Sequence, residues 1–156
     1  MTAAKKLFTI GYEQATQPAV LGALKDAGVE LLVDVRAVAA SRRPGFSKRQ
    51  LAAGLDERGI DYLHLRGLGT PAEGRTAARA GRHAEMRRIF EAELRTDRAQ
   101  GELAELLALV DSGRRVCLLC YERDHRHCHR AIIAERVCER IPAEVEHLAA
   151  VPGPLG

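Results

Sequence analysis

The chain has 156 residues, a formal net charge of +3 at pH 7, 46% hydrophobic residues and 29% charged residues. These values are typical of one soluble globular domain, long enough to bury a core without disulfide or metal crosslinks. No apolar run approaches the roughly 20 residues that span a membrane, and the first 13 residues contain no stretch typical of a signal peptide. We therefore expect one cytoplasmic domain over residues 1–156, with its core at about 7–149, a tail at 150–156 and no membrane partner.

Two strands and a helix are predicted at the start of the chain. Residues 6–10 form the first predicted strand. The following helix is capped at Thr16 or Gln17 and ends at Gly28. Residues 30–36 (ELLVDVR) are almost continuously aliphatic, which is typical of a parallel strand covered on both faces.

The middle of the chain begins with a well-marked helix start. Ser47 and Gln50 match the S-x-x-Q capping box, and Gly59 ends the helix that they predict. Residues 60–65 form the next predicted strand. Residues 66–82 hold four glycines and no periodic pattern, so we expect a long loop there, either a lid over a binding site or a disordered excursion.

The second half alternates between the two periodicities. Helices are predicted at about 86–94, 103–110 and 128–140, and strands at 115–120 and 145–148. Strands thus alternate with helices along the whole chain. This order predicts an α/β fold: a single compact domain with a mainly parallel sheet of about five strands, flanked by helices in a Rossmann-like, three-layer arrangement.

Ligands of such folds bind at the carboxyl ends of the strands. The residues that the predicted strands bring to this edge are Gly11, Tyr12, Glu13, Asp34, Arg36, His64, Cys120 and Glu122. Asp34 and Arg36 lie two apart on one strand and so share a face. They form either a salt bridge that aims Arg36 at a ligand or a purely structural pair. His64 is either a proton carrier or a hydrogen-bonded core histidine.

The segment 118–130 (LLCYERDHRHCHR) carries the densest set of reactive side chains. Cys128, His129 and Arg130 are expected in the first turn of the last long helix, where free N–H groups attract anions and favour a thiolate. Arg130 is expected to point toward the strand ends. It then either contacts a ligand or pairs with Glu122 or Asp34 to hold the loop.

The four cysteines admit further interpretations. A reducing cytoplasm predicts no disulfide, and Cys117 and Cys120 lie on opposite faces of a strand, which disfavours a C-x-x-C motif. Cys120 and Arg126 match the C-x5-R loop of cysteine phosphatases, but acidic residues within the loop would repel an anion. The side chains of His125, His127 and His129 with those of Cys120 and Cys128 make zinc the alternative cofactor, although no pair has a familiar chelating spacing. We therefore predict no cofactor.

Five motifs together resemble a known family. They are residues 9–12 (TIGY), 34–36 (DVR), 44–47 (PGFS), 62–69 (YLHLRGLG) and 119–130 (LCYERDHRHCHR). In this order they resemble the prokaryotic family named domain of unknown function 488 (DUF488). The resemblance implies a compact α/β domain whose motifs gather in one pocket, and it implies no catalytic roles.

The hypothesis that follows is an enzyme-like pocket for a phosphate-bearing ligand, a nucleotide or a nucleic-acid end, with hydrolase or transferase chemistry. Catalysis is assigned to Glu122, Cys128, His129, Cys120 and His64. Ligand binding is assigned to Tyr12, Asp34, Arg36, Arg130 and Gly11. The alternatives are a non-catalytic nucleic-acid-binding module, suggested by basic residues at 42–49 and 75–88, and a Cys/His metal protein. Oligomeric state is left open.

Overall fold

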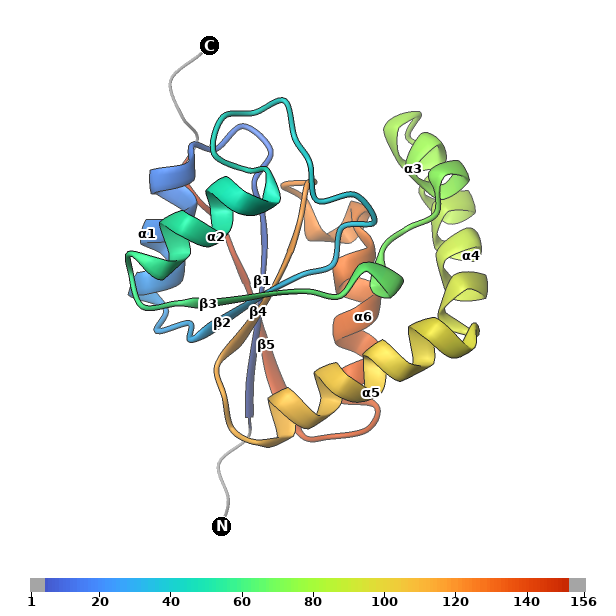
Figure 1. Cartoon of the computed structure of the whole chain (residues 1–156). Helices are drawn as coiled ribbons and strands as arrows, with labels where there is room; N and C mark the ends of the chain where they lie inside the picture. Colours follow the sequence, from blue (N-terminus) through green and yellow to red (C-terminus); the bar gives the residue numbers. More distant parts are fainter. Residues whose placement is uncertain (1–4, 152–156) are drawn as a thin grey trace.

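The computed structural model describes residues 5–151 and centres on one all-parallel sheet (Figure 1). The strands are β1 (Lys5–Gly11), β2 (Leu31–Asp34), β3 (Asp61–His64), β4 (Val116–Cys120) and β5 (Ala143–Leu148). Their order across the sheet is β3-β2-β4-β1-β5. The aliphatic strands β2 and β4 lie inside the sheet and are buried along their whole length, as strands covered on both faces must be.

Helices cover both faces of this sheet, which makes three layers (Figure 1). They are α1 (Gln17–Asp26), α2 (Lys48–Asp56), α3 (Ala72–Arg79), α4 (His83–Leu94), α5 (Asp97–Asp111) and α6 (His129–Cys138). The helices α1 and α2 pack on one face around Phe8, Ile10 and Phe46. The other helices pack on the opposite face, where the core includes Phe90 and Leu118.

The predicted α/β class, the parallel sheet and the three layers are confirmed. The caps explain where the first helix begins and ends: Thr16 accepts the N–H of Ala19, and Gly28 has a φ of 73° just beyond the helix. The strand order differs from the 3-2-1-4-5 of dinucleotide-binding folds, because β4 inserts between β2 and β1. The Rossmann-like part of the expectation is therefore not confirmed.

The segment 66–82 is not the predicted irregular loop. It holds a short 3-10 turn at Arg66–Leu68 and the helix α3. Gly74 interrupts the apolar pattern of this helix. A glycine is needed here because the position packs against Thr70 and Ile89, where a side chain would not fit. Alanine-rich sequence and packing on α4 overcome the low helix propensity of this glycine.

The predicted capping box at Ser47 is also wrong. Ser47 is the N-cap of α2, but its hydroxyl bonds the backbone of Ser41 instead of the helix. Gln50 likewise accepts the N–H of Gly45. The loop before α2 folds back, and the side chains of Ser47 and Gln50 therefore form hydrogen bonds with this loop instead of with the first turn of the helix.

The predicted tail at 150–156 lies mostly outside the described residues. Ala150 is buried in the core of the α1–α2 face, while the rest of the predicted tail from residue 152 lies outside the described residues. No helix of the described chain combines the length and apolar character needed to cross a membrane.

Candidate functional site

A cavity of about 680 Å³ opens at the carboxyl ends of β1, β2 and β4. The loops that follow these strands line one side of it, and α3 and α4 line the other. Six of the ten predicted site residues line the cavity: Tyr12, Arg36, Cys120, Glu122, Cys128 and His129. Gly11, Asp34, His64 and Arg130 do not line it; they support those that do.

Asp34 and Arg36 form a buried bidentate pair at the end of β2. Arg36 donates from Nε to Oδ1 at 2.8 Å and from Nη2 to Oδ2 at 2.7 Å, and the two side chains are 0% and 6% exposed. The same guanidinium donates to Tyr12 Oη and the Phe46 carbonyl, and Tyr62 donates to Asp34. Burial is the largest influence and lowers the pKa of Arg36, but the hydrogen bonds and the negative charge of Asp34, with Tyr12, together outweigh it and keep this pKa above its ordinary value.

Four of the five N–H groups of Arg36 thus have protein acceptors. The pair ties the ends of two strands to the loop before α2, which is the structural alternative raised from the sequence. Burial, and then the bond to Asp34, raise the pKa of Tyr62. His64 Nε2 lies 2.7 Å from the Arg36 carbonyl oxygen, so it too belongs to the support of this loop.

Arg130 is fully buried below the floor of the cavity. It donates to Thr9 Oγ1, Cys120 Sγ, and the carbonyls of Glu122 and Arg123, at 3.1, 3.2, 2.5 and 3.2 Å. Burial lowers its pKa to about 10, so it stays charged at neutral pH. It therefore holds the loop after β4, but through carbonyls and not through the carboxylates expected from the sequence.

The same loop explains Gly11. A Cβ at this position would overlap the carbonyl of Glu122, so the loop can cross the end of β1 only where a side chain is missing. The predicted anion site at the start of α6 is weakened by the local backbone, because the N–H of Cys128 donates to the His125 carbonyl.

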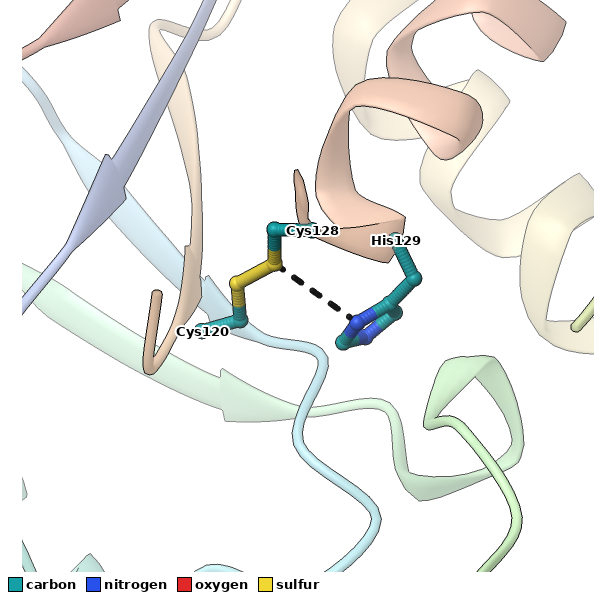
Figure 2. Close-up of side chains that lie close together, drawn as sticks. All are labelled: Cys120, Cys128 and His129. Atoms are coloured by element: carbon teal, nitrogen blue, oxygen red, sulfur yellow. Dashed lines mark hydrogen bonds between the residues drawn. A yellow bond between two sulfur atoms is a disulfide. The ribbon is translucent and has the colours of Figure 1, made fainter. Parts of the chain in front are cut away.

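Cys120 and Cys128 are joined by a disulfide (Figure 2), and both residues line the cavity. Cys120 ends β4 and Cys128 caps α6, and the cysteines are 1% and 2% exposed. This bond contradicts the prediction of no disulfide. The prediction took account of the compartment alone, whereas the strand-loop-helix connection brings the two sulfur atoms together. Cys117 and Cys120 lie in the cores of opposite faces, as their strand spacing predicts.

His129 completes this group (Figure 2). Its Nδ1 lies 3.7 Å from Cys128 Sγ, and its Nε2 lies 2.8 Å from the Val35 carbonyl oxygen. A carbonyl only accepts, so Nε2 carries the ring proton and the lone pair of Nδ1 faces the sulfur atoms. Burial lowers the pKa of His129 to about 4, which keeps the ring neutral at physiological pH.

Glu122 places a carboxylate beside the sulfur pair. Its Oε2 lies 3.7 Å from Cys120 Sγ, and burial raises the pKa of this carboxyl group above its ordinary value. Because Cys120, Cys128, His129 and Glu122 meet at one cavity, the arrangement can support sulfur chemistry, proton transfer or binding of a soft metal ion.

Sequence reasoning did not assign Arg75, Arg79 and His83 to the site, although they line the cavity from α3 and α4. The signal available was Pro71 followed by several alanines, which is typical of a helix start. The basic cluster at 75–88 is divided by the fold. Arg82 and Arg87 form ion pairs with glutamates, whereas the guanidinium groups of Arg75 and Arg79 contact only neutral oxygens.

The comparisons with known proteins agree with these motifs. No curated protein and no solved structure matched the chain. One family model did match, over residues 16–137, and its description is "Domain of unknown function DUF488". Because the match covers most of the chain and includes the loop and helix that carry the cysteines, the protein belongs to the DUF488 family.

Proposed function

We propose that the protein is a cytoplasmic enzyme in which Cys120 and Cys128 act as a reversible dithiol–disulfide centre. The observation that carries this proposal is that the two joined sulfur atoms lie at the floor of a cavity large enough for a small molecule. In a reducing compartment a disulfide is usually transient and catalytic or redox-sensing. Because the cysteines are only 1% and 2% exposed, the partner is a small dithiol that enters the cavity.

The two sulfur atoms have different surroundings, which sets the direction of exchange. Arg130 Nη1 lies 3.2 Å from Cys120 Sγ and favours negative charge on that atom. A ligand thiolate therefore attacks Cys128 Sγ, and the electron pair of the broken S–S bond passes to Cys120. The second thiolate of a dithiol ligand then attacks the ligand sulfur of the mixed disulfide and releases Cys128. One ligand disulfide and two protein thiols result, and the two ligand protons pass to the protein sulfurs or to water.

The test measures the state of each cysteine by alkylation and peptide mapping after treatment with diamide and then dithiothreitol. We expect diamide to form the Cys120–Cys128 bond and dithiothreitol to reduce it in folded protein. Cys138→Ser is the matched control, because Cys138 is a free cysteine on the same helix. A bond that never forms, or one that dithiothreitol reduces only after unfolding, would contradict the proposal.

A second candidate function, binding of a phosphate-bearing ligand in the same cavity, is favoured by Arg75 and Arg79. The guanidinium of Arg75 donates to the Thr70 carbonyl and that of Arg79 to the Thr76 hydroxyl. Within residues 5–151, neither has a carboxylate within ion-pair distance. A phosphate in the cavity would supply the missing negative charge. These arginines replace Arg36 and Arg130 in the anion-binding role, since both of those are held by the protein.

Thermal-shift measurements with inorganic phosphate and a panel of nucleotides test this candidate. We expect stabilisation of the wild type that is lost in Arg75→Ala/Arg79→Ala and kept in Arg87→Ala, whose arginine is paired with Glu91 and Glu135. If no phosphate compound stabilises the wild type, this candidate is wrong. Binding of duplex DNA that falls steeply with salt and survives the double substitution would favour the nucleic-acid module instead.

A further inference from the structure

We propose that the reduced protein binds one zinc ion through Cys120 Sγ, Cys128 Sγ and His129 Nδ1, with its fourth position open to the cavity. The three ligand atoms lie within 4.8 Å of one another, and all three residues are buried (Figure 2). This site goes beyond the proposed sulfur exchange, because it gives the same sulfur atoms a second role in the absence of oxidant.

The orientation of His129 is the first argument. A zinc-binding histidine almost always donates its other ring N–H to a carboxylate or a backbone carbonyl, which fixes the tautomer and aims the free nitrogen at the metal. Here Nε2 donates to the Val35 carbonyl at 2.8 Å, and Nδ1 faces Cys128 Sγ at 3.7 Å. The ring is therefore held in the orientation that a zinc ligand requires.

The distance between the two backbones is the second argument. The Cα atoms of Cys120 and Cys128 are 7.4 Å apart, beyond the range of about 4.4–6.8 Å usual for a disulfide. Tetrahedral zinc with bonds of about 2.3 Å would hold the two sulfur atoms roughly 3.8 Å apart. The loop and the helix are thus spaced for an atom between the sulfurs.

Charge is the third argument. Arg130 is fully buried, and among the described residues no carboxylate lies within 4.0 Å of its guanidinium. A neutral disulfide leaves this cation without a countercharge, whereas a thiolate at Cys120 lies 3.2 Å away and supplies one. The buried cation therefore favours the reduced state, in which both sulfur atoms are free to bind a metal, and the N–H···S bond from Arg130 would orient one of the ligands.

The donor set and the open side indicate the kind of site. One imidazole and two thiolates suit zinc and exclude magnesium and calcium, which prefer oxygen. Three protein ligands with one open position are typical of catalytic zinc sites, whereas structural sites use four. The open position faces the cavity near the Glu122 carboxylate, which lies 3.7 Å from Cys120 Sγ.

The experiment titrates metal-free, reduced full-length protein with ZnCl₂ and counts bound metal after dialysis. Cobalt substitution reports thiolate ligation by its absorption spectrum. We expect one zinc per chain in the wild type and in Cys138→Ser, and an affinity at least about 100-fold lower in Cys120→Ser and His129→Asn. Circular dichroism of both variants checks that they fold.

Oxidation with diamide provides a second readout, because a disulfide and a metal cannot share the sulfur atoms. We expect oxidised protein to bind no zinc. Zinc that fails to bind reduced wild type, or binds equally to the folded Cys120→Ser variant, overturns the proposal. If zinc fails while dithiothreitol still reduces the disulfide, only the metal site is wrong. If zinc binds but diamide forms no disulfide, only the proposed exchange chemistry is wrong.

Discussion

Replacing Arg36 with methionine should cost the protein about 3–5 kcal/mol of folding free energy, because it leaves one buried charge unpaired. Methionine keeps much of the apolar stem but removes both bonds to the Asp34 carboxylate, which is 0% exposed. Only the Tyr62 hydroxyl and the backbone N–H of residue 36 would still donate to it. At this chain length the loss corresponds to a melting temperature roughly 6–20 °C lower.

The protein contains a matched control for this experiment. Asp124 and Arg126 have the same spacing and the same two bidentate bonds, at 3.0 and 2.9 Å, but Arg126 is 76% exposed. Urea unfolding of Arg36→Met and Arg126→Met, followed by circular dichroism, compares equal geometry in two environments. We expect a large shift of the midpoint for the first variant and no measurable shift for the second, because water replaces the lost partner.

A double variant, Asp34→Asn with Arg36→Met, should recover part of the lost stability, since it removes the charge that the single variant leaves uncompensated. If Arg36→Met costs less than about 1 kcal/mol, or if both arginine variants shift the midpoint equally, burial does not govern the strength of this pair and the reasoning is refuted.

Four further substitutions test other parts of the structure. Gly11→Ala should lower the free energy of unfolding by at least about 1–3 kcal/mol, because its Cβ would overlap the Glu122 carbonyl. Gly101→Ala is the control: this glycine lies on an exposed helix surface with open space, so the substitution should raise the free energy of unfolding by about 0.5–1 kcal/mol. Thermal melts of both variants measure the two opposite shifts. Thr16→Ala removes the N-cap of α1 and should lower the free energy of unfolding, measured in urea, by about 1 kcal/mol. An unchanged free energy of unfolding would mean that this cap does not stabilise the protein. Burial, with the charges of His125 and Arg130, lowers the pKa of His147 to about 4, below its value in the unfolded chain. The unfolded state therefore binds more protons than the folded state between about pH 6.5 and 4, so stability should fall as the pH falls through this window. His147→Gln should flatten this pH dependence. Parallel stability-versus-pH curves for the wild type and the variant would contradict this account.

Local features of the sequence predicted most of the fold because they depend on neighbours in the chain. The cap at Thr16, the glycine at 28 and the aliphatic run that became β2 act over one turn or one strand. The strand-helix alternation then restricts the topology to a parallel sheet with helices on both faces. The carboxyl edge of that sheet is where the cavity lies, which the general rule for α/β folds anticipates.

Only the tertiary structure decided what each polar side chain does at that edge. The insertion of β4 between β2 and β1 places Arg130 under the loop after β4, where hydroxyl, sulfur and carbonyl atoms take up its donors. The pairing of Cys120 with Cys128, the tautomer of His129 and the arginines of α3 likewise depend on contacts between separate segments. The periodicity of the sequence indicates which face of a helix or strand a residue occupies, but not which residue it contacts there. That contact depends on how separate segments pack, and it decides whether a charged side chain is free to bind a ligand or is already paired within the protein.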